Sequence, residues 1–332
     1  MKRPLLLPLV PLYAAGLALR ELRLSRGWEQ IQHLGDPVIS IGNLSTGGSG
    51  KTPLAIALTR LLSSSGFQVD VLSRGYGRRS AVPLRVDLNG SAEQFGDEPL
   101  LIARETGVSV YVAAERYHAG VLAKADAIHN ERPLVHILDD GFQHRQLHRD
   151  IDILLVSRKD WHDHLLPSGN LREGLHASMR ASVLAIPADD PDFESELRIW
   201  GWTGPVWRLR RRMEIPNVSG PVAAFCGIAR PEQFFAGLEA GGTALAKQMS
   251  FPDHYRYTLR DIERLVATAG SMGARAIITT EKDQVRLGSL VSVFPSSLPL
   301  KTARLVLSIE DESRASEWLV GRLGATRAPQ SL

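Results

Sequence analysis

The residues with the clearest chemistry form one glycine-rich run. The run reads Ser45, Thr46, Gly47, Gly48, Ser49, Gly50, Lys51 and Thr52. Its glycines let successive backbone N–H groups converge on phosphate oxygens, and a helix that starts here adds the positive end of its dipole. In such a loop the lysine reaches the β and γ phosphates, and the threonine hydroxyl coordinates Mg²⁺. Although Ser45 replaces the first glycine of the usual motif, we predict a nucleoside triphosphate site rather than an ordinary glycine-rich turn.

A second candidate site is the pair Asp139 and Asp140, which ends the apolar segment 134–138. P-loop enzymes place a magnesium-associated carboxylate at the end of such a strand. Because consecutive strand residues point to opposite faces, we expect the two aspartates to have different roles. We assign Asp139 to the Mg²⁺ sphere and Asp140 to supporting the metal ligands or ordering the loop. The reverse assignment and a purely structural role both stay open.

These residues need a sheet that brings them together. The apolar segment 38–42 precedes the glycine-rich run, and a helical pattern follows from Pro53. Further apolar segments without polar alternation predict strands at 68–72, 108–113, 134–138, 151–156 and 182–186. Strands of this kind, separated by helical stretches, indicate a parallel sheet covered on both faces. Ligands of such sheets bind beyond the carboxyl ends of the strands, where the glycine-rich run falls.

The chain has 332 residues, which is enough for two hydrophobic cores. A polar, tryptophan-bearing stretch at 188–216 predicts a linker, and a second αβ series follows it. We therefore predict an α/β protein with a P-loop NTPase-like, mostly parallel sheet and a second, smaller α/β domain. The expected limits are 1–30 for an N-terminal membrane-associated helix, 31–215 for the P-loop domain with its linker, 216–325 for the second domain and 326–332 for a disordered tail.

The first thirty residues combine apolar and basic side chains. Residues 4–19 are largely apolar, and the flanking cations are Lys2, Arg3, Arg20, Arg23 and Arg26. The apolar segment is shorter than the roughly 20 residues of a spanning helix and is interrupted by prolines. Arginines beside an apolar face suit a leaflet rich in anionic lipid. We expect a helix that lies on a membrane surface; a signal peptide and a helix buried on the second domain are the alternatives.

Composition argues against several other classes. The single cysteine, Cys226, rules out an internal disulfide and paired-cysteine metal motifs. The arginine run at 208–212 is short and has no recognisable nucleic-acid module around it, so we expect no nucleic-acid partner.

Seven further motifs occur in order along the chain. They are Asn43 before the run, SRGYGR at 73–78, GDE at 96–98, DDGFQHR at 139–145, GNLRE at 169–173, FPDH at 251–254 and TTEKD at 279–283. Each motif is weak alone. Together they resemble the tetraacyldisaccharide 4′-kinase family of Gram-negative bacteria, from the basic N-terminal helix to about residue 320.

The resemblance implies a kinase bound to a membrane surface. Members of this family transfer the γ-phosphate of ATP to the 4′ hydroxyl of a tetraacylated glucosamine disaccharide 1-phosphate, which gives lipid IVA in lipid A biosynthesis. The resemblance thus implies ATP and Mg²⁺ as cofactors, the acylated disaccharide as partner and the cytoplasmic face of the bacterial inner membrane as location. A lipid acceptor agrees with the apolar, basic N-terminus, and a phosphorylated sugar agrees with arginine-rich loops.

The resemblance also implies roles for single residues. Asp97 matches the family's catalytic carboxylate and is expected to accept the hydroxyl proton, paired with His254 across the cleft between the domains. Lys51 is expected to neutralise developing phosphate charge. The expected acceptor contacts, with loop-ordering hydrogen bonds as the alternative, are Asn43, Arg74, Tyr76, Arg116, Gln143, His144, Arg172 and Glu173. The family commonly has proline after this last pair, where Gly174 stands here.

Two alternatives would use the same loop differently. A P-loop switch or assembly ATPase would bind and release partners, but the chain shows neither the base-specificity spacing of GTP switches nor the Cys or His clusters of metal-insertion switches. A soluble small-molecule kinase would have no use for the apolar N-terminal helix. Binding of this helix to vesicles would therefore separate that alternative from a kinase with a lipid acceptor.

Overall fold

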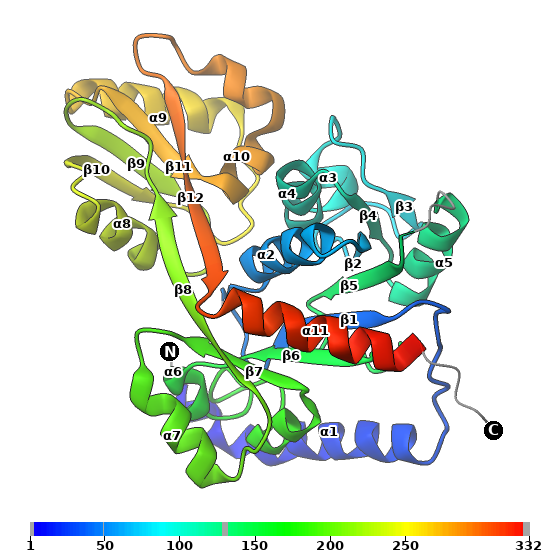
Figure 1. Cartoon of the computed structure of the whole chain (residues 1–332). Helices are drawn as coiled ribbons and strands as arrows, with labels where there is room; N and C mark the ends of the chain where they lie inside the picture. The colour runs from blue at the N-terminus through cyan, green and yellow to red at the C-terminus, as the bar shows by residue number, and fades with distance from the viewer. Residues whose placement is uncertain (1–2, 49, 128–131, 328–332) are drawn as a thin grey trace.

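Within residues 3–48, 50–127 and 132–327, which the computed structural model describes, one twelve-stranded sheet runs through the molecule (Figure 1). The strands are β1 (Val38–Asn43), β2 (Gln68–Ser73), β3 (Leu84–Arg85), β4 (Ser109–Val112), β5 (Leu134–Asp139), β6 (Ile151–Leu155), β7 (Val183–Pro187), β8 (Val206–Glu214), β9 (Val222–Cys226), β10 (Leu245–Ser250), β11 (Ala276–Thr280) and β12 (Leu300–Ile309). Their spatial order is β10-β9-β11-β12-β8-β7-β6-β1-β5-β2-β4-β3.

Helices cover both faces of this sheet. The α-helices are α1 (Val10–Ser25), α2 (Lys51–Ser64), α3 (Ala92–Phe95), α4 (Asp97–Thr106), α5 (Arg116–Asp126), α6 (Arg158–Trp161), α7 (Pro191–Trp200), α8 (Pro231–Ala240), α9 (Leu259–Ser271), α10 (Glu281–Leu287) and α11 (Glu312–Arg327). Three 3-10 helices lie within the described ranges, namely η1 (Pro4–Leu9), η2 (Leu175–Arg180) and η3 (Gly288–Val293).

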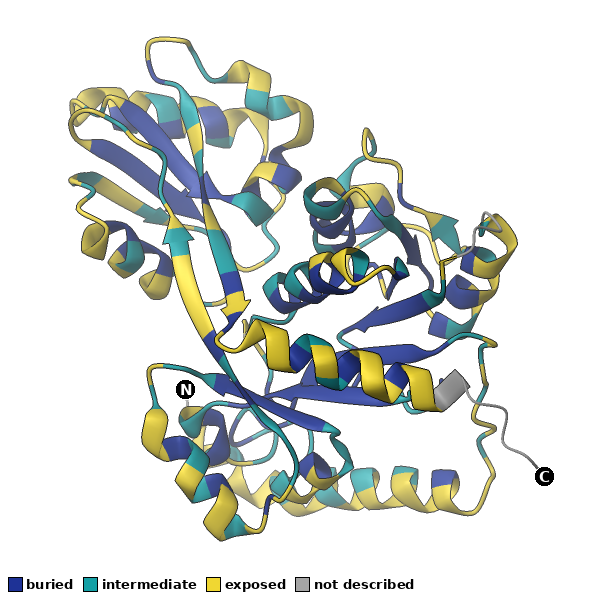
Figure 2. Ribbon diagram, in the orientation of Figure 1, coloured by how far each residue is buried: buried dark blue, intermediate teal, exposed yellow. Residues whose placement is uncertain are grey.

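The central strands β6, β1, β5, β2 and β4 pair in parallel. Ile39 of β1, for example, lies beside Ile137 of β5 on one side and Ile151 of β6 on the other. These strands are apolar and buried on both faces, because helices cover both sides of the sheet (Figure 2). The predicted mostly parallel sheet is confirmed. Parallel pairing also places the carboxyl ends of these strands at one edge, where a site is expected.

Alternate residues of β1 pack on opposite faces of the sheet, as the strand period requires. Ile39 shares a hydrophobic cluster with Leu54 of α2 and Leu100 of α4. Val38 lies in a separate cluster with Ala119 of α5. Because α2 begins at the end of the glycine-rich loop, its packing on β1 fixes the position of that loop.

A second, smaller set of strands and helices surrounds β9, β10 and β11 (Figure 1). Phe234 and Leu238 of α8 pack on one face of these strands, and Ile262 and Leu265 of α9 pack on the other. The antiparallel pair of β8 and β12 connects this part to the remainder of the sheet. We call the part built on β1–β7 the P-loop lobe and the part built on β9–β11 the second lobe.

The stretch at 188–216, predicted as a linker, has regular structure. It contains α7 and the nine-residue strand β8, which pairs with both β7 and β12. Trp207 and Leu209 are buried and alternate with arginines that are exposed or half-buried. This period of two is typical of a half-buried strand. The sequence predicts a linker here rather than β8, because the dense charge at 208–212 obscures this alternation.

The C-terminal helix α11 packs against the P-loop lobe. Its Leu319 and Leu323 lie in the same hydrophobic cluster as Ile39, and Ser316 is hydrogen-bonded to Ser65 after α2 at 3.0 Å. The expected second domain, 216–325, includes this helix, so the domain limits given above stay a proposal. Of the expected disordered tail, residues 326 and 327 continue α11 and residues 328–332 lie outside the described residues.

The N-terminal segment exposes most of its apolar side chains. Leu5 is 93% exposed and Leu12 is 74% exposed. Length and composition alone would let Pro4–Ser25 cross a membrane, a criterion that signal sequences also meet. Tyr13 contacts the P-loop lobe instead, since its hydroxyl donates to the main-chain carbonyl of Arg172 at 2.9 Å. One side of α1 is thus held by the protein while its apolar side chains face outward.

Candidate active site

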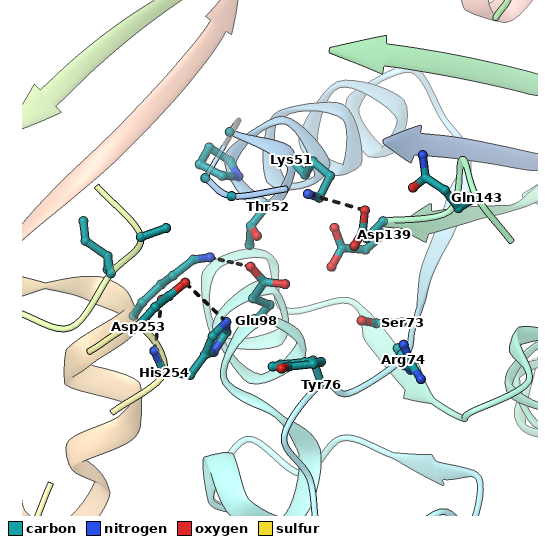
Figure 3. Close-up of a pocket in the computed structure, with 18 of the residues that line it drawn as sticks. Lys51, Thr52, Ser73, Arg74, Tyr76, Glu98, Asp139, Gln143, Asp253 and His254 are labelled. Carbon is teal, nitrogen blue, oxygen red and sulfur yellow. Dashed lines mark hydrogen bonds and ion pairs between the residues drawn. The ribbon is translucent and has the colours of Figure 1, made fainter. Parts of the chain in front are cut away.

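A cleft of about 1470 Å³ lies at the carboxyl edge of the sheet, and both lobes line it. The P-loop lobe contributes the glycine-rich loop, the end of β5 and the loop after β2. The second lobe contributes residues 228–230, 253–254 and 280–282. In Figure 3, Lys51, Thr52 and Asp139 face Glu98 and His254 across this space. The predicted nucleotide loop therefore opens onto a cavity that two separately packed lobes enclose.

The glycine-rich loop has the backbone that its sequence predicts. Gly47 and Gly50 have φ angles of 105° and 95°, which residues with a side chain rarely adopt. The residues of this loop that line the cleft are Gly47, Gly48, Gly50, Lys51 and Thr52. Ser49 lies outside the described residues. Ser45 and Thr46 do not line the cleft and instead hold the loop in place. The Asn43 side chain donates to the carbonyl of Ser45 at 2.8 Å, and Thr46 N–H donates to the carbonyl of Asn170 at 2.8 Å.

Lys51 is oriented by two groups at the base of the cleft. Its ammonium donates to Asn43 Oδ1 at 3.0 Å and lies 3.4 Å from Asp140 Oδ1. Arg172 contacts the same carboxylate, with Nη1 3.2 Å from Oδ2 of Asp140. Although burial raises the pKa of Asp140, Lys51 and Arg172 lower it further than burial raises it. Asp140 is therefore a carboxylate held between two cations.

The neighbouring Asp139 has different surroundings. It is 2% exposed, and its Oδ1 atom has no hydrogen-bond partner among the described residues. Burial raises the pKa of Asp139, and the nearby carboxylates of Glu98 and Asp140 raise it further. The chain turns directly after Asp139, because Asp140 has a φ of 50°, which lies in the left-handed region. An unpartnered buried oxygen beside other acids is a place where a cation would stabilise the structure.

The donor set suits Mg²⁺. No group of three His, Cys, Asp or Glu side chains with metal-binding geometry occurs in the described part of the chain. Mg²⁺ beside a nucleotide needs no such group, since it binds one or two carboxylates, phosphate oxygens and waters. Thr52 and Asp139, which both line the cleft, supply a hydroxyl and a carboxylate of this kind. These residues fit the ion.

Asp97 and His254 meet across the boundary between the lobes. Asp97 is the first residue of α4, and His254 follows β10 in the second lobe. His254 Nδ1 lies 3.0 Å from Oδ2 of Asp97. Asp97 holds the pKa of His254 above its usual range, mainly through this hydrogen bond. Burial raises the pKa of Asp97, but His254 and Arg286 lower it well below its usual range. The pair is thus a carboxylate that holds an imidazole.

The two members of the pair differ in access to the cleft. Asp97 is 4% exposed and does not line the cavity, whereas His254 lines it and its side chain is 34% exposed. The ring of Tyr76 lies against His254, with centroids 5.1 Å apart (Figure 3). His254 has a φ of 57°, a conformation that a residue with a side chain adopts at a cost. This backbone conformation places the His254 ring between Asp97 and the cleft.

Close backbone contact brings the loops of Asp97 and Tyr76 together. Gly96 has a φ of 90°, and a Cβ at this position would lie 3.0 Å from Gly75 in the loop after β2. Any larger residue at position 96 would push this loop, and Tyr76 with it, away from α4.

The sequence assigned no role to three residues at or behind the cleft, namely Glu98, Lys282 and Arg286. Lys282 of α10 forms an ion pair with Glu98 of α4, and Arg286 of α10 contacts Asp97. The sequence analysis noted Lys282 within its motif but assigned it no role. The sequence did contain a signal for the start of α10, because Thr280 and Asp283 form a helix cap at the end of β11. A helix that starts at the carboxyl edge of the sheet points its first turns at the site.

The predicted acceptor residues divide into two groups. Those that line the cleft are Arg74, Tyr76, Arg116, Gln143, His144 and Arg172. Asn43 and Glu173 do not line it: Asn43 holds Lys51 and the loop, and Glu173 forms an ion pair with Arg180 at 2.6 Å. For these two residues the geometry favours the loop-ordering alternative.

The lining residues make one end of the cleft electropositive. Burial lowers the pKa of Arg116 to about 10, and Arg74 lowers it too. Burial also lowers the pKa of His144 to about 4, with contributions from Arg116 and Arg149. A neutral His144 among arginines donates or accepts hydrogen bonds without adding charge. Such a surface suits an anionic group such as a sugar phosphate.

The fold and this site define the class of the protein as a P-loop phosphotransferase: a phosphate-binding loop and an Asp–His pair meet at one interlobe cleft. The comparison with known families shows which family within this class the chain belongs to. The model of the tetraacyldisaccharide-1-phosphate 4′-kinase family matches residues 2–323, and the chain belongs to this family.

Individual relatives agree with this assignment. The tetraacyldisaccharide 4′-kinase of Koribacter versatilis is 40% identical over 324 residues, covering 94% of this chain and 97% of the relative. The corresponding enzyme of Aquifex aeolicus is 38% identical over 323 residues, with 92% and 96% coverage. A crystal structure of LpxK from Aquifex aeolicus in complex with ATP superposes with a TM-score of 0.75 at 34% identity and covers 96% of this chain and 98% of that one.

Proposed function

We propose that this protein transfers the γ-phosphate of ATP to the 4′ hydroxyl of a tetraacylated glucosamine disaccharide 1-phosphate and so forms lipid IVA. The observation that carries the proposal is the Asp97–His254 contact of 3.0 Å, formed by both lobes at the cleft onto which the P-loop opens. A switch ATPase needs a water-positioning group rather than a base for a sugar alcohol. Membership in the kinase family supports the same reading.

In the proposed reaction the 4′ oxygen forms a bond to the γ-phosphorus while the bond from this phosphorus to the β–γ bridging oxygen breaks, and ADP leaves. The hydroxyl proton moves to Nε2 of His254. The sequence analysis gave this proton to Asp97, but Asp97 is buried behind the cleft and His254 lines it. We therefore assign the proton to His254. Asp97 would orient the imidazole, and it raises the pKa of His254, which makes His254 a stronger base.

The P-loop provides the positioning and most of the charge stabilisation. Lys51 would contact the β and γ phosphates from the position in which Asn43 and Asp140 hold it. Thr52 and Asp139 would hold Mg²⁺. When bound, this ion would supply positive charge that offsets the negative charge developing during transfer. The ATP complex of the Aquifex aeolicus relative supports ATP as the nucleotide.

The acceptor would bind at the basic end of the cleft. Arg74, Arg116 and Arg172 lie there with Gln143 and His144, and the planar guanidinium of arginine pairs well with a phosphate. The acyl chains would remain in the membrane, which the exposed leucines of η1 and α1 would contact from the cytoplasmic face. Tyr13 and Arg20 support this arrangement, because both connect α1 to loops at this end of the cleft.

Product analysis tests the proposal. Wild-type protein is incubated with ATP, Mg²⁺ and tetraacyldisaccharide 1-phosphate in mixed micelles, and tandem mass spectrometry locates the added phosphate. We expect one new phosphate on the distal glucosamine at the 4′ position. A product phosphorylated on another hydroxyl would refute the assigned acceptor geometry, and ATP hydrolysis without a phosphorylated lipid would favour the switch reading.

A further inference from the structure

Arg286 lies at the centre of a buried network behind the Asp97–His254 pair. Its side chain is 5% exposed. Nε donates to Oδ2 of Asp97 at 2.7 Å, and Nη2 lies 3.4 Å from Nδ1 of His254. Nη1 donates to Oδ1 of Asp283 at 3.1 Å and to the carbonyl of Gly227. One guanidinium thus connects the pair to the turn after β9 and to its own helix.

The network that holds Arg286 is rigid on the second-lobe side. Asp283 is fully buried and accepts hydrogen bonds from Gly227 N–H at 3.0 Å, from the Tyr257 hydroxyl at 2.8 Å and from the Thr280 hydroxyl at 2.6 Å. A carboxylate with this many donors cannot rotate without losing several of them. Asp283 therefore fixes the guanidinium, and the guanidinium reaches Asp97 in the other lobe.

These contacts determine where the protons of the pair lie. Both Nε and Nη2 of Arg286 contact Oδ2 of Asp97. Because an arginine has donors only, this oxygen must be an unprotonated acceptor. The proton between His254 Nδ1 and the same Oδ2 atom must then reside on the histidine. A neutral imidazole with its hydrogen on Nδ1 has its lone pair on Nε2, which is the atom that the proposed reaction needs.

We propose that Arg286 is a positioning residue for phosphoryl transfer: by holding Oδ2 of Asp97 it fixes the tautomer and the ring orientation of His254. The inference rests on the proposed function of the pair as the base. It adds a residue that no motif in the chain pointed to, and it makes the second lobe responsible for both the imidazole and the group that orients its partner.

Other charges also face the pair and act on any pH dependence. They are Glu98 on α4, Asp253 in the loop before His254, and Lys282 and Asp283 on α10. All of them remain when Arg286 alone is replaced. Removing the Arg286 cation takes away a charge that lowers the pKa of His254. The acidic limb of the activity profile is therefore expected to move to higher pH in an uncharged variant.

The test compares Arg286→Gln and Arg286→Lys with wild type and with the control Arg260→Gln, an exposed arginine on α9. We expect kcat for lipid phosphorylation to fall on the order of 10- to 100-fold in both Arg286 variants, with KM for ATP nearly unchanged, because misplacement of a reacting group has this size of effect. The acidic limb of the kcat profile should move to higher pH in Arg286→Gln. It should stay at the wild-type pH in Arg286→Lys, which keeps the charge.

A second measurement is independent of activity and covers poor folding of the glutamine variant. Imidazole ¹⁵N chemical shifts of His254, assigned by comparison with His254→Asn, report the tautomer in the full-length protein. We expect the Nδ1–H form in wild type and in Arg260→Gln, and a mixture of tautomers in Arg286→Lys. A lysine variant with wild-type kcat and the wild-type tautomer would overturn the inference. Wild-type protein without any lipid phosphorylation would instead overturn the proposed function.

Discussion

At the level of single residues, the proposed chemistry depends on the contact between Asp97 and His254. The two side chains come from different lobes, and their atoms lie 3.0 Å apart. Because they act as a unit, their substitutions should not be additive. We expect Asp97→Ala and His254→Asn each to lower kcat by on the order of 10²-fold or more, and the double variant to lose little beyond either single one.

This prediction is checked by steady-state phosphorylation kinetics together with nucleotide titration by calorimetry. ATP affinity should stay near wild type in all three variants, because neither residue belongs to the P-loop. Additive losses in the double variant would mean that the two residues act independently, contrary to the geometry.

The pair also predicts the pH dependence of the reaction. His254 accepts a proton only when Nε2 is unprotonated, and Asp97 raises the pKa at which this nitrogen is protonated. Activity should therefore fall as the pH decreases through this raised pKa, at a higher pH than for an ordinary histidine. Replacing Asp97 with Asn removes the main cause of the shift. In that variant the acidic limb of the remaining activity should move to lower pH, which a profile of kcat against pH would show.

Lys51 provides a prediction for the nucleotide end of the cleft. Its ammonium is held by Asn43 and Asp140 in the loop that should contain the phosphates. We expect Lys51→Ala to lower kcat/KM for ATP on the order of 10²-fold or more, as removal of a preorganised charge does. Lys159→Ala, which removes an exposed lysine on α6, is the matched control. Full ATP-dependent activity in Lys51→Ala would rule out this loop as the phosphate site.

Most of the residues that the sequence singled out as site residues line the cleft, because short motifs mark phosphate loops and acids at strand ends. The sequence did not separate Asn43 from Arg74, since β1 ends at Asn43 and Arg74 follows β2 at the same edge of the sheet. Only the packing shows that Asn43 holds Lys51 and does not line the cleft. The sequence analysis also missed Arg286, whose partners lie 189 and 59 positions away in the chain. The Thr280 cap marks the helix that carries Arg286, but no local pattern marks contacts across such distances.

At the level of elements, α1 has the most direct functional consequence. Its Tyr13 is held by the P-loop lobe, while Leu5 in η1 and Leu12 in α1 are exposed. Replacing both leucines with Asp removes the burial of two large apolar side chains in lipid, about 1.5–3 kcal/mol each. We expect partitioning onto anionic vesicles to weaken by on the order of 10²-fold or more.

Vesicle sedimentation with increasing lipid measures this effect, and Met272→Asp, at an exposed methionine of the second lobe, is the control. Equal partitioning of the double variant and wild type would show that α1 does not bind the membrane, and it would favour a soluble acceptor.

The strands were easier to predict than the elements that connect the lobes. β9 and β11 are buried along their whole length and belong to the second αβ series that the sequence predicts after residue 216. β8 was missed because its arginines obscured the alternation of Trp207 and Leu209. α10 was also missed, since seven residues of which five are charged or amides resemble a polar turn until the Thr280 cap is recognised.

At the level of the whole molecule, the account depends on one cleft shared by two lobes. Each lobe has its own hydrophobic packing, and β8 and β12 connect them. The P-loop lobe would hold the nucleotide while the second lobe brings His254 and Arg286 to it. A cleft formed by both lobes would keep water away from the bound phosphate, which limits transfer of the phosphate to water.

The most direct test of this account is phosphate transfer from γ-labelled ATP, with Mg²⁺, to tetraacyldisaccharide 1-phosphate in mixed micelles, with wild type and Asp97→Ala measured side by side. The account predicts labelled lipid from wild type, at least on the order of 10²-fold less from Asp97→Ala, and equal nucleotide binding by both proteins. Labelled inorganic phosphate from wild type without labelled lipid would contradict it.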